Sequence, residues 1–330
     1  MNTFGRRLRL TTFGESHGKE IGGVIDGYPS GIRIDFEALQ RAMDERRPGR
    51  PGTSQRREED KPEFLSGINS EGVTLGTPIA FVIKNKDVRS TDYDSLTQWF
   101  RPNHADYTYQ KKYGIRDPRG GGRSSARETA CRVVAGELAT QFLAGKGIHV
   151  SARLSSVGMT GDPDSLMAEV EKARADGDSV GGTVECTVTG VPAGLGDPVY
   201  GKLSAMLASA MMSINAAKGF EIGDGFELAL RRGSEVVDKF VMNPDGEIET
   251  ITNHSGGIQG GISNGMPIVF RVAFKPTPTI GKPLPLINEK GEEKCEIIPG
   301  RHDPCVAVRG VAVIKAMAAL TIADALLSGE

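Results

Sequence analysis

The chain has 330 residues, of which 40 are Lys or Arg and 42 are Asp or Glu, so its formal net charge is −2 at pH 7. This balance excludes a protein whose overall charge draws it to nucleic acid or to a membrane surface, and any basic site must be local. The length allows a large hydrophobic core. No shift in composition marks a domain boundary, so we expect a single domain over residues 1–330.

The four cysteines, at positions 131, 186, 295 and 305, show neither a C-x-x-C spacing nor a metal-ligand cluster. This pattern favours a reduced, cytoplasmic chain without a metal site. The first residues lack the continuous apolar segment of a signal peptide, and no later run approaches the roughly 18 to 20 apolar residues of a membrane span. Many of the 43 glycines occur in pairs, which predicts loops whose backbone comes close to a ligand.

The first two predicted strands flank a loop that contains a histidine. Short apolar runs within residues 8–34 predict a strand, the loop GESHG at residues 14–18, and a second strand near residues 23–25. His17 follows Ser16 in this loop and has the ordinary pKa range of a proton donor. A histidine that only fixes the turn by hydrogen bonding explains the same residues equally well.

A short helix and an arginine-rich loop follow. Asp35 is the expected N-cap of the helix, which carries Leu39 and Met43 on one face. Residues 44–60 are almost wholly polar, and Pro and Gly stand between several arginines, which predicts a loop. These arginines, Arg46 among them, either face solvent or reach over a site that binds phosphate or carboxylate groups.

Residues 101–132 hold an unusual density of basic residues and glycine. His104 and seven Arg and Lys residues precede position 128, and three glycines stand together at 120–122. Glycine lets backbone N–H groups approach a ligand, and a helix that begins just after it directs its positive dipole end to that ligand. The spacing of Ser125 and Glu128 is that of a capping box before a helix. An anion site and a serine that only caps the helix are both compatible with this pattern.

The rest of the chain alternates predicted strands and helices. Strands are expected at residues 76–83, 149–157, 183–189, 220–230 and 267–274, and helices at 164–175, 203–214 and 310–327. Gly219 is the expected C-cap of the second of these helices. The loops at residues 253–261 and 275–279 bring glycines, hydroxyl groups and Lys275 to positions that suit recognition of a phosphate or a polar ring.

Two nucleotide-binding motifs are absent. No G-x-G-x-x-G follows a predicted strand, and no Gly-Lys pair is followed by Ser or Thr. The sequence therefore offers neither the dinucleotide fingerprint nor the phosphate-binding loop of common nucleotide enzymes. The five histidines do not form a zinc spacing.

Taken in order, the motifs resemble those of the chorismate synthase family. The resemblance covers essentially the whole chain: GESHG at 14–18, RPNHADYTY at 101–109, GGGRSSARET at 120–129, SINAAKGFEIGDGF at 213–226, NHSGGIQGGISNG at 253–265, KPTPT at 275–279 and RHDPCV at 301–306. It implies an α+β fold, namely a single-domain β-α-β sandwich with helices between antiparallel sheets, assembled as a homotetramer. The predicted strands and helices are compatible with this fold but do not by themselves produce its topology.

The resemblance also implies an activity. Members are lyases of the shikimate pathway, which serves aromatic amino acid biosynthesis. They convert 5-enolpyruvylshikimate 3-phosphate to chorismate and phosphate by an anti 1,4-elimination that requires reduced FMN without net redox change. Loss of phosphate leaves cationic character on the ring, which an electron-rich flavin can stabilise. The flavin is reduced either by the protein itself with NADPH or by an external flavin reductase, and the absence of a nicotinamide motif favours the external reductase.

Motif matching implies roles for single residues. His17 corresponds to a histidine proposed to protonate the flavin, and His104 to one proposed to assist the departing phosphate. Ser16, Ser125 and Asp303 match polar residues proposed to steer proton acceptance by the flavin. The two carboxylates and the phosphate of the substrate are assigned to Arg46, Arg101, Arg127 and Arg301. The implied FMN contacts are Arg123, Ser124, Ser125, Asn215, Ala216, Gly260, Lys275, Pro276, Thr277, Pro278, Thr279 and Arg301.

The chain departs from the usual family pattern at several positions. Asn103 stands where glycine is common, and because asparagine tolerates a left-handed φ, we expect His104 to keep its place. The other departures are Pro278 and Thr279 (two serines in many members), Gly52 (often arginine) and Lys315 (usually glutamate).

Two other functions fit the same motifs. One is a different flavin-dependent phosphate lyase, which acts on another enol-ether or cyclic substrate. The other is a non-catalytic protein that binds FMN or a phosphometabolite, and the presence of both His17 and His104 argues against it.

Overall fold

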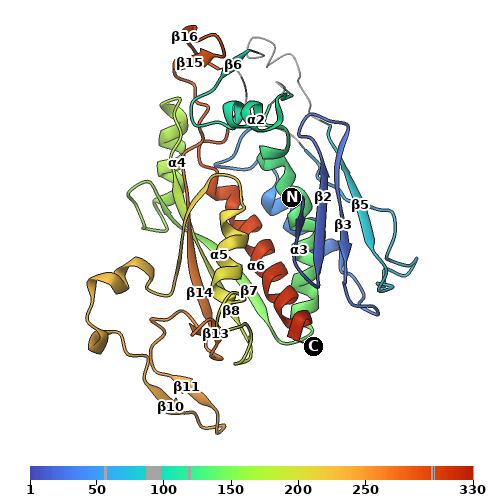
Figure 1. The fold of residues 1–330 in the computed structure, drawn as a ribbon, viewed down its shortest axis with the longest axis vertical. Helices are drawn as coiled ribbons and strands as arrows, with labels where there is room; N and C mark the ends of the chain where they lie inside the picture. Colours follow the sequence, from blue (N-terminus) through green and yellow to red (C-terminus); the bar gives the residue numbers. More distant parts are fainter. Residues whose placement is uncertain (56–57, 87–97, 118–119, 299, 301, 330) are drawn as a thin grey trace.

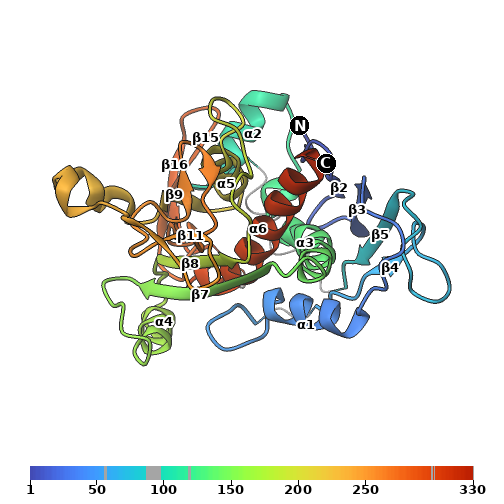
Figure 2. The same ribbon diagram turned by 90° about the horizontal axis from the view of Figure 1, so that it is seen from below.

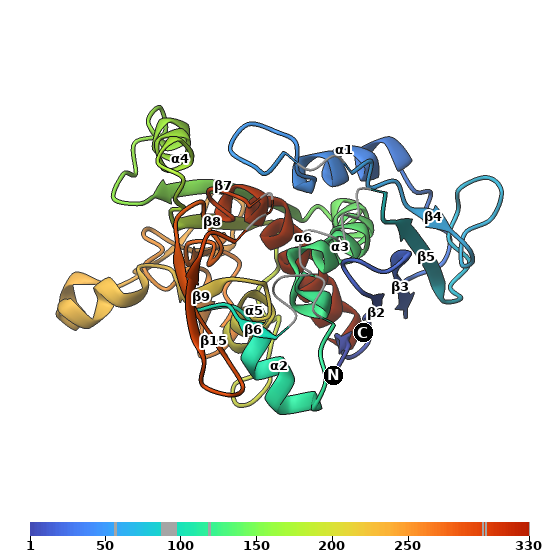
Figure 3. The ribbon, with the colours of Figure 1, turned by 90° about the horizontal axis from the view of Figure 1, so that it is seen from above.

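A computed structural model describes the chain except residues 56–57, 87–97, 118–119, 299, 301 and 330. Figure 1 shows a layer of helices between two antiparallel sheets. In this layer α3 (Thr129–Ala144) and α6 (Ala307–Gly329) lie side by side. The perpendicular views in Figure 2 and Figure 3 place sheet strands on both sides of this helix pair. The expected α+β class and β-α-β sandwich are therefore confirmed.

The first sheet is antiparallel and has the strand order β1-β2-β3-β5-β4. Its strands are β1 (Thr3–Phe4), β2 (Arg9–Gly14), β3 (Glu20–Asp26), β5 (Ile79–Lys84) and β4 (Glu63–Phe64). In β5 the side chains of Ile79, Phe81 and Ile83 are buried, and their neighbours point to the opposite face. The Phe81 ring fills the space over Gly23 of β3, where a Cβ atom would lie 2.9 Å from the ring.

The second sheet has the order β7-β8-β14-β9. Its strands are β7 (His149–Val157), β8 (Gly182–Thr189), β14 (Ile268–Phe274) and β9 (Ala217–Ile222). Alternate residues of β8 and β14, such as Val184 and Phe270, are fully buried toward the helices. Burial of each such side chain contributes roughly 1.5–3 kcal/mol. The buried residues of alternate positions are therefore the main source of the free energy that packs this sheet against the helices.

Smaller elements complete the described structure. A three-stranded sheet joins β6 (Trp99–Phe100), β15 (Leu284–Asn288) and β16 (Glu293–Glu296), and two hairpins pair β10 (Phe240–Met242) with β11 (Ile248–Thr250) and β12 (Ile258–Gln259) with β13 (Ile262–Ser263). The other helices are α1 (Phe36–Arg46), α2 (Asp106–Tyr113), α4 (Leu166–Ala175) and α5 (Leu203–Met212), with 3-10 turns η2 (Gly122–Ser124), η3 (Ala126–Glu128), η4 (Gly225–Leu230) and η5 (Gly233–Glu235).

The central helices pack unusually closely because of one glycine. A Cβ atom at Gly136 of α3 would lie 2.3 Å from Cβ and 2.4 Å from Cα of Ala316 in α6. At the far end of α6, the Asp324 carboxylate accepts hydrogen bonds from the backbone N–H groups of Arg6, Arg7 and Leu8, the last two at 2.7 and 2.9 Å. These contacts hold the segment before β2 against the helix layer.

The expectation that no segment reaches the length and apolarity of a membrane span is wrong for α6. This helix satisfies both criteria, but 78% of its most apolar stretch is buried inside the fold. A helix covered by protein on both sides is apolar around its whole circumference, because every face must be desolvated.

Several local predictions are confirmed. The loop at residues 14–18 lies between β2 and β3, and the strand expected at residues 149–157 is β7. Asp35 is the N-cap of α1, where its side chain accepts a hydrogen bond from the Ala38 N–H at 2.8 Å.

Two predictions near residue 220 are wrong. The strand expected at residues 220–230 ends at Ile222, and η4 follows, because Gly223 and Gly225 adopt φ values of 58° and 57° that interrupt an extended strand. Gly219 is not a C-cap: α5 ends at Met212, and Gly219 belongs to β9. Pairing of β9 with β14 therefore outweighs the local helix-stop signal.

The capping box expected before α3 is also not formed. Ser125 accepts a hydrogen bond from the Arg127 N–H at 3.3 Å and caps the 3-10 turn η3, after which α3 begins. The Glu128 carboxylate bonds instead to the Thr12 hydroxyl at 3.1 Å and to Arg132. The helix itself is present as predicted.

Replacement of Gly136 by alanine tests the close approach of α3 and α6. We expect the free energy of unfolding to fall by about 1–3 kcal/mol, because the added methyl group overlaps the Ala316 backbone. This loss outweighs the roughly 1 kcal/mol that alanine gains over glycine in helix propensity. Urea unfolding followed by circular dichroism measures the change. The matched control is Gly233→Ala, where a Cβ atom meets nothing within 4 Å; equal stabilities for the two variants would contradict the prediction.

Candidate active site

A cavity of about 410 Å³ lies at the end of the helix layer where α3 and α6 begin. Its wall includes Ser125 and Ala126 just before α3, and Val306 and Arg309 at the start of α6. This volume lies within the usual range for a small-molecule site. The positive ends of two helix dipoles point toward the cavity, so it favours anions.

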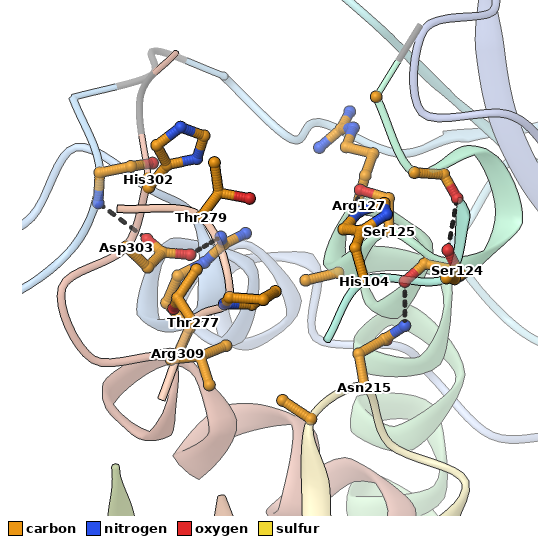
Figure 4. A pocket seen from close by; sticks show the side chains of 18 of the residues that line it. His104, Ser124, Ser125, Arg127, Asn215, Thr277, Thr279, His302, Asp303 and Arg309 are labelled. Atoms are coloured by element: carbon orange, nitrogen blue, oxygen red, sulfur yellow. Dashed lines mark hydrogen bonds and ion pairs between the residues drawn. The ribbon is translucent and has the colours of Figure 1, made fainter. Parts of the chain in front are cut away.

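Many residues assigned from the sequence meet at this cavity. They are Arg46, Arg101, His104, Ser124, Ser125, Arg127, Asn215, Ala216, Lys275, Thr277, Pro278, Thr279 and Asp303. In Figure 4, one group stands on each side of the opening: Thr277, Thr279, His302, Asp303 and Arg309 face His104, Ser124, Ser125, Arg127 and Asn215. The first group comes from the segment after β14 and from residues just before and at the start of α6, and the second mostly from residues 104–127.

Ser16 and His17 lie directly behind this wall. A Cβ atom at Gly120, which lines the cavity, would lie 2.7 Å from His17 Nε2 and 3.4 Å from Ser16 Oγ. Gly120 has a φ of 75°, so both the backbone conformation and the space exclude a side chain here. The backbone of Gly120 therefore lies between the His17 imidazole and the cavity.

Other assigned residues lie elsewhere in this chain. Arg123 directs its guanidinium away from the cavity, to the Thr12 hydroxyl at 2.6 Å and the Gly14 carbonyl at 3.2 Å. Gly260 lies in the β12–β13 turn, next to the N-terminal end of α5, whereas Asn215 follows the opposite end of that helix. Pro276 is not part of the cavity wall, and Arg301 lies outside the described residues.

Asp60 joins two of the cavity arginines. Its fully buried carboxylate accepts hydrogen bonds from Arg46 Nη1 at 2.9 Å and from Arg127 Nη1. Burial alone would raise the pKa of Asp60, but the Arg46 and Arg127 guanidinium groups hold it below its ordinary value. Burial lowers the pKa of Arg46 to about 9, which still leaves it protonated at neutral pH. One buried anion between two cations leaves a net positive charge at the cavity.

Asp106 organises a second charged cluster around His104. It accepts hydrogen bonds from Arg101 Nε at 2.7 Å and Nη2 at 2.8 Å, and it lies 2.9 Å from His104 Nδ1. Burial would raise the pKa of Asp106, but hydrogen bonds from Arg101 and His104 hold it well below its usual range. Burial lowers the pKa of His104, and the bond to Asp106 opposes that change.

A third group of hydrogen bonds fixes the Asp303 side chain. Its carboxylate accepts hydrogen bonds from the Ser54 N–H at 2.8 Å and from Arg309 Nη1 at 2.7 Å, both of which Figure 4 shows as dashed lines. Burial would raise the pKa of Asp303, but Arg309 and the Ser54 N–H hold it below its ordinary value. Arg309 also donates from Nε to the Arg46 carbonyl at 3.1 Å, which ties the start of α6 to the end of α1.

Two buried polar atoms at the cavity lack a protein partner in the described structure. They are Asn215 Oδ1 and Thr277 Oγ1. Asn215 itself is held in place, because its Nδ2 donates to the Ser124 carbonyl at 2.7 Å. A buried polar atom without a partner costs about 1–3 kcal/mol, which a polar ligand or water offsets when it binds there.

The departures from the family pattern have clear positions. Asn103 has a φ of 56°, which confirms the expected left-handed conformation, and its carbonyl accepts a hydrogen bond from Lys275 Nζ at 2.7 Å. Lys315 shares the lining of a small cavity with Glu45 and Glu137, and its charge lowers the pKa of Glu137, which burial raises. The lysine therefore stands beside carboxylates.

Several charged residues of the site have no assignment from the sequence, among them Asp60, Asp106 and Arg309. Asp106 and Arg309 lie within or just after the motifs at residues 101–109 and 301–306, so their charge and position were available signals. Asp60 has no comparable local signal, because its partners are 14 and 67 residues away.

Comparison with known proteins gives a consistent result. A family model described as "Chorismate synthase" matches residues 8–327. The chain is 55% identical to the chorismate synthase of Porphyromonas gingivalis, over 100% of this chain and 96% of that protein, and 53% identical to that of Christiangramia forsetii, over 100% and 98%. A solved structure described as "Crystal Structure of Chorismate Synthase" is similar with a TM-score of 0.76 and 31% identity, covering 99% of this chain and 93% of that one.

Replacement of Asp60 by asparagine tests the buried arginine pair. Asparagine tolerates the φ of 48° at this position, so the variant removes the charge and keeps the backbone. We expect the free energy of unfolding at pH 7 to fall by about 3–5 kcal/mol, because two buried guanidinium groups lose their counterion. The control is Asp26→Asn, which breaks an exposed pair with Arg9 and costs at most about 1 kcal/mol.

The same variant predicts a pH dependence. The folded-state pKa of Asp60 lies below its ordinary value of 3.8, so its contribution is present above that value and is lost as pH falls through the folded-state pKa. The difference in stability between wild type and Asp60→Asn should therefore narrow below about pH 4. Urea midpoints measured from pH 7 to pH 3 test this, and a constant difference would contradict it.

Proposed function

Because the chain belongs to the chorismate synthase family, we propose that it is a carbon–oxygen lyase that converts 5-enolpyruvylshikimate 3-phosphate to chorismate and phosphate. The reaction is an anti 1,4-elimination that uses reduced FMN without net redox change and serves aromatic amino acid biosynthesis. The observation that carries the proposal is the cavity at the start of α3 and α6, whose wall combines buried arginines with polar atoms that have no partner among the described residues. A substrate with two carboxylates and a phosphate requires such fixed cations.

The arginines differ in how they act on the substrate. All three side-chain nitrogens of Arg46 are hydrogen-bonded, to Thr129, Asp60 and the Ala126 carbonyl. These bonds use three of its five N–H groups and fix the guanidinium, so we assign to Arg46 mainly an effect of its charge. The nitrogens of Arg127 are likewise engaged.

Arg309 is placed differently, since Nε and Nη1 have partners but Nη2 has none among the described residues. Arg309 can therefore offer both N–H groups of Nη2 to a substrate anion. Arg101, which is held by Asp106, and Arg301, assigned by the resemblance, complete the proposed substrate-binding set.

The residues at the cavity fit FMN. Asn215 Oδ1 and Thr277 Oγ1 are buried polar atoms without a hydrogen-bond partner among the described residues, and the dipole of α3 favours a phosphate. The residues that would hold FMN are Ser124, Ser125, Asn215, Ala216 and the segment from Lys275 to Thr279, in which Lys275 N donates to the Ala216 carbonyl at 3.0 Å. When bound, reduced FMN supplies electron density to the substrate ring as the phosphate leaves.

Two of the FMN contacts assigned by the resemblance, Arg123 and Gly260, do not line the cavity. Arg123 connects the glycine loop to β2 through Thr12 and Gly14, so we propose that it shapes the loop rather than contacting the cofactor with its side chain. We propose Gly260 as an FMN contact on the family resemblance alone, because it does not line the cavity of this single chain.

We assign separate proton transfers to the two histidines. His104 lines the cavity and assists the departing phosphate as an acid, whereas His17 acts from behind Gly120 as the proton donor toward the flavin. Ser16 lies beside His17, and Ser125 and Asp303 bracket the cavity from opposite sides. Asp303 stays ionised and fixed, so it stabilises nearby positive charge without moving.

An anaerobic assay tests this function. Purified protein with reduced FMN and 5-enolpyruvylshikimate 3-phosphate should release chorismate and phosphate in equal amounts while FMN remains reduced. Folded protein that releases no chorismate would overturn the proposal. Phosphate release from a different enol ether, without chorismate formation, would favour another phosphate lyase, and tight binding without turnover would favour a non-catalytic binding protein.

Further properties belong to the same proposal. We propose a single domain, supported by one hydrophobic cluster that joins strands of both sheets with α1, α3, α5 and α6. We also propose a cytoplasmic location and assembly as a homotetramer. The assembly is supported by exposed apolar side chains on the arm that projects at β10 and β11 (Figure 1): Phe226, Leu230, Val237, Phe240, Met242, Ile248 and Ile251. An external flavin reductase is the proposed electron source, and reduction of bound FMN by NADPH alone would contradict that part.

The variant His17→Ala tests the proton-donor assignment. We expect chorismate formation to fall by roughly 10²–10⁴-fold, the usual contribution of a general acid, while FMN and substrate bind as in wild type. Fluorescence titration of FMN and the anaerobic assay measure both properties. His149→Ala, at an exposed position of β7, is the matched control and should retain full activity. An unchanged rate in His17→Ala would refute the assignment.

A further inference from the structure

We propose that Asp106 is the positioning residue of His104, and that it sets the tautomer in which this histidine presents Nε2 for proton transfer. The inference rests on the proposed function, because it names how one histidine of that reaction is prepared. The family motifs assign no role to Asp106, but its side chain contacts both Arg101 and His104.

Asp106 is held from three directions. It is the first residue of α2 and only 4% exposed. Besides the side-chain bonds from Arg101, it accepts the Arg101 backbone N–H at 3.1 Å, and Arg116 Nη1 approaches it at 3.3 Å. Two guanidinium groups and the helix N-terminus surround one carboxylate, so Asp106 remains ionised and cannot rotate.

An ionised carboxylate can only accept hydrogen bonds. Because Asp106 Oδ1 lies 2.9 Å from His104 Nδ1, that nitrogen must carry a proton. Nε2 is then protonated only in the cationic ring, and this proton is the one that His104 can deliver to a leaving oxygen. The arrangement follows the logic of a buried aspartate that orients a catalytic histidine.

The charges around His104 act in opposite directions. Asp106 supports the imidazolium, whereas burial, Arg101 and Arg116 oppose it. From the neighbouring segment, Lys275 donates to the carbonyl of Asn103, and so it adds a further positive charge next to the ring. Among these charged groups only Asp106 favours the protonated imidazole, so the acidic form of His104 depends on it.

The same carboxylate also reaches the second histidine indirectly. Arg101 Nη2, which Asp106 holds, donates to the Gly120 carbonyl at 3.0 Å. Gly120 in turn packs against the His17 ring. Asp106 therefore anchors the backbone that separates the two histidines.

Nuclear magnetic resonance of the wild-type protein without ligands tests the tautomer directly. Histidine labelled with ¹⁵N is assigned to position 104 by comparison with His104→Gln. We expect the neutral ring to carry its proton on Nδ1, as the ¹⁵N shifts and couplings to the ring protons report. A proton on Nε2 with bare Nδ1 would overturn the proposal, whether or not the protein forms chorismate.

Kinetics of Asp106→Asn provide the second test. We expect kcat to fall roughly 10–100-fold, as for residues that support a functional side chain, and KM to rise as well because Asp106 also holds Arg101. The imidazolium loses the charge to which it is directly hydrogen-bonded, so the His104 pKa should fall and the alkaline limb of kcat should move to lower pH. FMN affinity should remain close to that of wild type, because Asp106 is not among the residues that would hold FMN. An unshifted pH profile would overturn the proposal.

Two controls separate the possible outcomes. Asp178→Asn, which breaks an exposed pair with Lys282, should leave both kcat and its pH profile unchanged. Asp106→Glu, which keeps the charge, should restore part of the activity and of the pH profile that Asp106→Asn loses. If Asp106→Asn does not fold, the tautomer of the wild-type ring still decides the proposal. Absence of chorismate formation by the wild type would instead refute the proposed function.

Discussion

The burial of arginine side chains against a few carboxylates is the constraint on which this structure depends. Removing a guanidinium group or a carboxylate from water costs several kcal/mol, and only a partner with good hydrogen-bond geometry offsets that cost. Asp60 pairs with Arg46 and Arg127, Asp106 with Arg101 and Arg116, and Asp303 with Arg309: three carboxylates and five arginines. Each pairing fixes the direction of an arginine, so the cavity acquires a rigid wall of positive charge before any ligand arrives.

The sandwich makes these pairings possible. Both central helices begin at the same end of the layer, which brings residues 124–127 and 303–309 to opposite sides of one cavity (Figure 4). Their close approach at Gly136 and Ala316 keeps the two walls at a constant separation. The apolar core thus sets the distance across the site, while the buried ion pairs set its charge.

The motifs predicted much of the site but not its internal partners. His104, Ser125 and Asp303 were assigned through the family resemblance, because each stands in one of its short motifs. The role of Asp60 could not be predicted in this way, because it depends on contacts across 14 and 67 residues. The direction of the Arg123 side chain could not be predicted either. Its guanidinium donates to acceptors on β2, which lie next to it only in the folded structure.

The sequence by itself determined the family, the alternating strands such as β7 and the apolar helices, because these follow from residue order and local periodicity. Tertiary structure decided what local patterns leave open. It turned residues 217–222 into a strand by pairing them with β14, and it made α6 a core helix by covering it with protein. It also brought Asp106, Arg101 and Gly120 together between two histidines. Local signals cannot determine such contacts, because their free energy appears only when distant segments exclude water together.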